Sequence, residues 1–223
     1  MKRIMFYLAT FFVVITFASF VQADTRTYEF DFEFSGATPP EGEAPWIRAT
    51  FDDGGSPGSV TLTLEDINLT DAEHVKAWYF NFDPGLDPAN LIFTQTSGPG
   101  NATVSNDPDP SNNEYKADGD GLYDIMIEFT ENRFEAGDVA QFNIQHAGIT
   151  AASFDFLSQP DGGHGPYLAA AHIGGIGPND ADSGWVAPTG NGSPNPIPEP
   201  ATMLLLGSGM VGLLAFRRNL KRK

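Results

Sequence analysis

The sequence predicts an all-β fold, an antiparallel two-sheet β-sandwich of the jelly-roll-like type, with an open barrel as the alternative. Apolar and polar residues alternate along several short segments, as in strands that have one buried and one solvated face. Clusters of glycine, proline and aspartate separate these segments and favour turns. No window of ten or more residues between 24 and 187 has helical periodicity. An N-terminal signal helix and a C-terminal transmembrane helix are expected to flank the domain.

Five segments carry the alternating pattern, and each predicts a strand. In chain order they are residues 28–34, 60–65, 78–83, 123–129 and 141–145. Their apolar positions are expected to face the core: Tyr28, Phe30, Phe32, Phe34, Val60, Leu62, Leu64, Trp78, Phe80, Phe82, Tyr123, Ile125, Ile127, Phe129, Phe142 and Ile144. The intervening turn clusters, such as residues 52–58 and 97–100, indicate about eight to ten strands in the domain.

Residues 1–23 have the organisation of a secretory signal peptide. Lys2 and Arg3 form a basic start, an apolar run follows at 4–20, and the segment ends in small or branched residues. We predict that signal peptidase cleaves between Ala23 and Asp24, so that the mature chain lies outside the cytoplasm. An uncleaved membrane anchor is the alternative.

The C-terminal 36 residues have three further parts. Residues 188–197 are rich in proline, glycine and asparagine and read as an extended linker. The motif Pro198, Glu199, Pro200 precedes an apolar segment at 201–216, which as a helix would reach about 24 Å into a hydrocarbon core of about 30 Å. A basic tail at 217–223 follows.

The basic tail predicts how this segment is oriented in the inner membrane. Arg217 and Arg218 begin the tail directly after the apolar segment. Cations at this position act as a membrane stop and remain cytoplasmic, so everything before the segment faces outward.

This C-terminus resembles the PEP-CTERM sorting signal. The resemblance is carried by residues 198–202, 204–209, 212–214 and 216–218, and the region that it covers is roughly an eighth of the chain. It implies that an exosortase in the inner membrane recognises the Pro-Glu-Pro motif, cuts near it and passes the protein toward the cell surface. Such proteins are characteristic of Gram-negative bacteria that make exopolysaccharide. The ectodomain also resembles a group of PEP-CTERM proteins with β-sandwich domains of unassigned function, in residues 78–84 and 171–177.

The charge distribution excludes several classes of protein. Residues 24–187 hold 28 acidic and five basic residues, a net charge of −23. Nucleic-acid binding is not expected, because phosphate contacts need clustered cations. The chain has no cysteine, which excludes disulfides, thiolate metal sites and cysteine nucleophiles.

No catalytic motif is present in the sequence, and we predict that the protein is not an enzyme. The four histidines are scattered, and neither H-E-x-x-H nor G-x-S-x-G occurs. Residues 207–212 match G-x-G-x-x-G, but they belong to the apolar C-terminal segment rather than to a βαβ unit. The alternative is a secreted polysaccharide hydrolase that uses two carboxylates.

One acidic loop has the oxygen ligands that calcium prefers. Asp118, Asp120 and Asp124, with loop carbonyls, are the candidate ligands of a structural calcium ion. The alternative is a solvated acidic loop that binds no metal. No other cofactor is expected.

Taken together, the sequence predicts an exported, non-enzymatic protein of the extracellular polysaccharide or biofilm matrix. It crosses the inner membrane, is anchored there transiently, and reaches the cell surface or matrix after exosortase processing. Its expected partners are signal peptidase, exosortase and extracellular polysaccharide.

Overall fold

The computed structural model describes residues 23–70, 72–100, 102–108, 113–118, 121–129, 133–189 and 193–194. The predicted signal helix, the Pro-Glu-Pro motif, the apolar C-terminal segment and its basic tail lie outside these residues. Among the residues that are described, no helix has the length and apolar character needed to cross a membrane.

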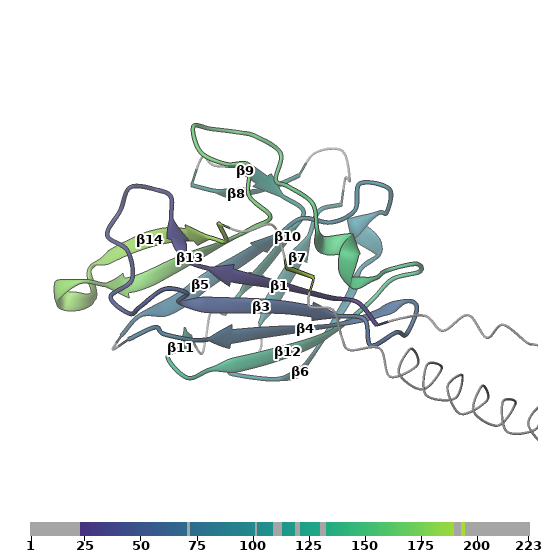
Figure 1. The fold of residues 1–223 in the computed structure, drawn as a ribbon, viewed down its shortest axis with the longest axis horizontal. Helices are drawn as coiled ribbons and strands as arrows, with labels where there is room; N and C mark the ends of the chain where they lie inside the picture. The colour runs from purple at the N-terminus through teal and green to yellow at the C-terminus, as the bar shows by residue number, and fades with distance from the viewer. Residues whose placement is uncertain are drawn as a thin grey trace, which may run out of the picture.

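The described chain is all-β, and every strand pairing is antiparallel. The first sheet has six strands, in the order β15 (Ser193–Pro194), β1 (Thr25–Phe30), β3 (Ile47–Asp52), β4 (Ser59–Asp66), β12 (Val139–Gln145) and β6 (Ile92–Ser97). Figure 1 shows β1, β3, β4 and β12 side by side. Residues 193–194 of the predicted linker thus pair with β1 and form an edge of this sheet.

The second sheet has the order β2 (Phe32–Glu33), β14 (Asp182–Ala187), β13 (Ala169–Ile176), β5 (His74–Phe80), β10 (Ile125–Glu128) and β7 (Thr103–Asn106). A short strand, β11 (Phe134–Glu135), also pairs with β5. A separate hairpin is made by β8 (Tyr115–Ala117) and β9 (Gly121–Tyr123). Three 3-10 helices complete the described elements: η1 (Pro88–Asn90), η2 (Ala151–Phe154) and η3 (Pro178–Asp180).

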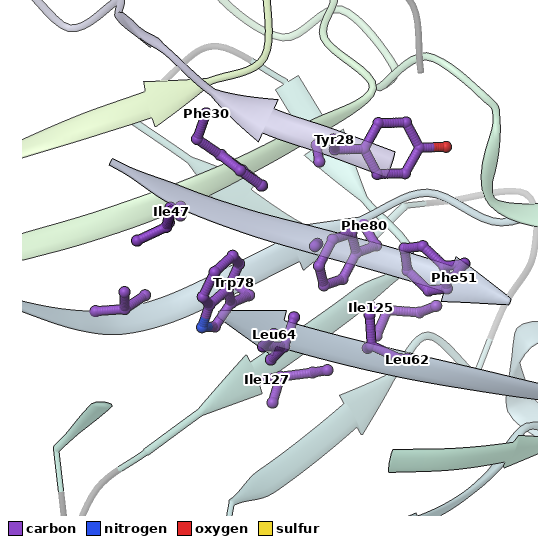
Figure 2. Close-up of a cluster of buried hydrophobic side chains, with 14 of the residues drawn as sticks. Tyr28, Phe30, Ile47, Phe51, Leu62, Leu64, Trp78, Phe80, Ile125 and Ile127 are labelled. Atoms are coloured by element: carbon purple, nitrogen blue, oxygen red, sulfur yellow. The ribbon is translucent and has the colours of Figure 1, made fainter. Parts of the chain in front are cut away.

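The facing sides of the two sheets share one hydrophobic core, as in a β-sandwich. Strand β4 contributes Val60, Leu62 and Leu64, all fully buried, as their alternation predicts. From the second sheet, Trp78 and Phe80 of β5 meet them in the same cluster, as Figure 2 shows. The buried face of each strand therefore follows the period-two pattern of its sequence.

The predicted strand at 28–34 is divided between the two sheets. Tyr28 and Phe30 are buried in the shared core from β1, but Phe32 in β2 is 42% exposed. The chain leaves the first sheet at Asp31, whose N–H donates to Ala187 O of the second sheet at 3.3 Å. The prediction that Phe32 faces the core is therefore wrong, because the residue belongs to an edge strand of the other sheet.

A second hydrophobic cluster covers the outer side of the second sheet. Tyr79, Tyr123 and Phe34 are buried there together with Ala117 of the β8–β9 hairpin. The predicted alternation assigns one face of each strand to solvent. Here that face is partly covered, because the hairpin and its neighbours pack onto it.

Candidate functional site

One cavity lies where β5 ends and β10 begins. It has a volume of about 310 Å³. Its walls come from four segments of the sequence: the loop after β5, the chain before β8, the start of β10 and the chain before β13. The polar and exposed residues that line it are Asn81, Asp83, Asn113, Asp124, Leu157 and Gln159. A cavity of this size is within the range of small-molecule sites.

The loop after β5 forms a fixed wall of this cavity. Asp83 N–H donates to Ser153 O at 2.8 Å, which ties the loop to η2. The Asp83 side chain then accepts from Gly85 N–H at 2.8 Å, and its carbonyl accepts from Leu86 N–H at 2.9 Å. An aspartate that bonds the backbone two residues on is the usual start of such a turn.

Asp124 supplies a buried carboxyl group to the same cavity. Only 6% of the residue is exposed, and its Oδ2 accepts from Phe82 N–H at 2.7 Å. The pKa of Asp124 is raised to about 6 in total. Burial is the largest cause, the hydrogen bond from Phe82 N–H lowers the pKa, and the nearby Asp107 raises it. The carboxyl therefore titrates near neutral pH rather than in the acid range.

The raised pKa predicts that Asp124 destabilises the fold as the pH rises. Between pH 4 and pH 6 this carboxyl is already ionised in the unfolded chain but still holds its proton in the folded one, so the free energy of unfolding falls. Relative to Asp124→Asn, the wild-type protein should lose up to about 3 kcal/mol over this range. Urea titrations of both proteins at pH 4, 5, 6 and 7 measure the difference. The control is Asp118→Asn, at an exposed residue. The prediction is contradicted if the free energies of unfolding of the wild type and of Asp124→Asn differ by the same amount at every pH.

Asn81 presents an unused acceptor at the cavity wall. Its Nδ2 donates to the carbonyl oxygens of Tyr167 at 3.3 Å and Leu168 at 3.2 Å, which fixes the amide. Its Oδ1 is buried and has no hydrogen-bond partner among the residues that the structure describes. A buried carbonyl without a partner is costly, so this position favours a ligand or solvent that donates a hydrogen bond.

A second cavity, of about 280 Å³, lies next to the first and shares Leu157 with it. It is lined by Phe32 and Tyr167, whose ring centroids are 6.4 Å apart, and by the start of the predicted linker. That start is held in place because Thr189 donates to both carboxylate oxygens of Asp31, at 2.8 and 2.7 Å. We call the two together the paired cavities.

The predicted calcium ligands occupy different environments. Asp118 is exposed at the turn of the β8–β9 hairpin, whereas the Asp124 carboxylate is buried against Phe82 N–H. Asp120 lies outside the described residues. Across the described ranges, no three histidine, aspartate or glutamate side chains gather as metal ligands. Calcium binding stays a prediction.

Two of the four histidines, His74 and His172, lie on the paired strands β5 and β13. His74 is buried, with Nδ1 at 2.9 Å from Ala72 O. His172 stacks on Trp185 with ring centroids 4.4 Å apart and planes 4° from parallel. Burial, together with Lys76 and His74, lowers the pKa of His172 to about 4, so this ring is neutral at pH 7.

Sequence reasoning did not find the paired cavities. Asp124 was singled out only as a metal ligand, and Asn81 only as a polar position on a strand. The available signal was the pair of polar residues, Asn81 and Asp83, at the end of an otherwise buried strand and directly before Pro84. A strand end followed by a proline turn is a place where side chains of several loops meet.

Comparison with known proteins identifies the C-terminus. Residues 196–219 match the family model described as the PEP-CTERM protein-sorting motif. The match contains Pro198, Glu199 and Pro200 and the whole apolar segment at 201–216, so the chain carries a PEP-CTERM sorting motif as the resemblance implied. Searches of curated proteins and of solved structures found no match.

Proposed function

We propose that the chain is the precursor of an exported protein that exosortase cleaves and sorts to the cell surface, where its β-domain serves as a non-enzymatic part of the polysaccharide matrix. The match to the PEP-CTERM sorting motif at residues 196–219 carries this proposal. The N-terminal signal pattern supports it, because the β-domain must first cross the inner membrane. The apolar segment and its basic tail then hold the precursor in that membrane until cleavage.

The β-domain suits a role outside the cell. Its strong excess of acidic residues keeps it soluble in an extracellular medium and discourages self-association. A jelly-roll-like sandwich is part of the proposal. It is supported by neighbouring strands that are distant in the sequence, in the order β4-β12-β6 in one sheet and β13-β5-β10 in the other, because such orders require connections that cross between strands. The fold is stable without disulfides in principle, because the shared core draws large aromatic side chains from both sheets.

A carboxylate-based polysaccharide hydrolase is the second candidate function. Asp83 and Asp124 line one cavity, and the raised pKa of Asp124 suits a general acid. Against this, each carboxylate already accepts a backbone hydrogen bond, from Gly85 and from Phe82 respectively. These bonds use both carboxyl groups to hold the backbone at the end of the strand. We therefore favour a binding role for the cavity over hydrolysis.

The proposed route predicts the two ends of the released protein. We expect the mature chain to begin at Asp24 and to lack everything from about Ala201 onward, because signal peptidase and exosortase remove the two ends. Intact-mass spectrometry of protein recovered from the extracellular matrix measures both ends in a single experiment. Extracellular protein that still contains the 201–216 segment would overturn exosortase processing, and a chain that begins at Met1 would overturn signal cleavage.

A further inference from the structure

The paired cavities lie side by side on one surface of the β-domain and share a wall at Leu157. The two cavities, of about 310 and 280 Å³, each have room for roughly ten water molecules, which is more than one pyranose residue needs. A ligand that fills both must therefore continue past Leu157 from one cavity to the next. A chain of linked units meets this requirement better than a single compact molecule.

The first cavity offers hydrogen-bond acceptors to whatever binds in it. Asn81 Oδ1 is buried and has no partner in the described part of the chain, and Asp83 and Asp124 line the same cavity. No lysine, arginine or histidine is among the described residues that line either cavity. The occupant must donate hydrogen bonds and carry no negative charge, because an anion would meet two carboxyl groups and no cation.

The rest of the lining is apolar and partly exposed. Four large hydrophobic residues of the described chain are exposed, and two of them, Leu157 at 55% and Phe32 at 42%, lie at these cavities. Tyr167 stands beside Phe32 in the second cavity. Apolar and aromatic surface next to hydrogen-bond acceptors suits a sugar ring, which has C–H faces and a rim of hydroxyl groups.

We infer that the paired cavities bind two consecutive residues of an uncharged polysaccharide, with hydroxyl groups donating to Asn81 and the sugar rings packing on Leu157 and Phe32. The inference rests on the proposed function, since a protein sorted to the matrix meets such polymers there. It narrows that function to one class of glycan, because uronate-rich or sulfated chains are disfavoured by Asp83 and Asp124.

The test uses the mature protein recovered from the culture and matrix polysaccharide from the producing cells. The polysaccharide is treated with protease and separated by anion exchange into an uncharged and an acidic fraction. Affinity electrophoresis in native gels that contain either fraction measures binding. We expect the uncharged fraction to retard the protein and the acidic fraction to leave its migration unchanged.

Three variants of exposed residues test the location. Leu157→Ala should weaken binding by about tenfold, because it removes the wall that both sugar residues contact. Phe32→Ala should weaken it through the second cavity alone. Ile92→Ala, which removes a 60% exposed side chain from the edge strand β6 that lines neither cavity, should bind like the wild type.

Several results would overturn the inference. The first is binding to the acidic fraction, and the second is binding to neither of the protease-treated fractions. The third is an equal loss of affinity in Leu157→Ala and Ile92→Ala. An effect of Leu157→Ala without one of Phe32→Ala would overturn the assignment of two sugar residues. If the protein is processed and found in the matrix but fails this test, only the inference is lost. The proposed function fails separately, when the mature ends are not found.

Discussion

Replacing Glu199 by alanine should leave the precursor in the inner membrane and nearly abolish its release. The substitution removes the single charge of the Pro-Glu-Pro motif, which lies inside the matched sorting sequence. The apolar segment at 201–216 and the basic tail are unchanged, so the membrane stop persists while recognition is lost. Loss of one desolvated charge contact costs about 2–5 kcal/mol, which corresponds to at least about a 30-fold fall in processing.

Immunoblots of membrane and extracellular fractions measure this effect. The control is Asn191→Ala, in the linker ahead of the matched residues, which should be released like the wild type. A second control deletes the basic tail and tests the membrane stop independently of the motif. Normal release of the Glu199→Ala protein would show that Pro-Glu-Pro is only part of the linker, and it would remove the main support for exosortase sorting.

Much of the shared core could be predicted from the sequence, because strand residues alternate between two faces. Val60, Leu62 and Leu64 in β4, and Phe142 and Ile144 in β12, are buried as that pattern requires. Strand pairing then follows from burying these faces against a second sheet. In such segments the alternation of the sequence is enough to predict which side chains the tertiary fold buries.

The same reasoning was wrong at Phe32 because alternation does not reveal where a strand leaves its sheet. The residues from 28 to 34 alternate without interruption, yet the chain passes from one sheet to the other at Asp31. That crossing depends on the hydrogen bond to Ala187, more than 150 positions away. A local pattern carries no information about so distant a partner.

The paired cavities could not be predicted for a similar reason. Their walls combine Asn81 and Asp124 with Leu157. Alternation assigns Asn81 and Asp124, polar positions of the segments 78–83 and 123–129, to the solvated face, but both are buried, and Leu157 lies in a segment without regular structure. The raised pKa of Asp124 arises from burial by these segments and not from its sequence neighbours. Loop geometry of this kind depends on the complete fold.

The largest loss of stability is expected from Phe51→Ala in the shared core. Phe51 of β3 is fully buried, and its ring stacks on Phe154 of η2 with centroids 4.0 Å apart. It also meets Phe80 of the second sheet edge-on at 5.1 Å, as Figure 2 shows, and Tyr28 at 6.0 Å. The side chain thus joins both sheets to η2. Truncating such a phenylalanine leaves a cavity and costs about 3–5 kcal/mol.

This cost is a large part of the 5–15 kcal/mol that separates a typical folded domain from its unfolded state. Urea denaturation of the mature protein, followed by tryptophan fluorescence, measures the change in the free energy of unfolding. Phe32→Ala is the matched control, since it is the same substitution at a residue that is 42% exposed, and it should cost less than about 1 kcal/mol. Equal losses for the two variants would mean that Phe51 does not hold the two sheets together, and would place the stabilising contacts of the domain elsewhere.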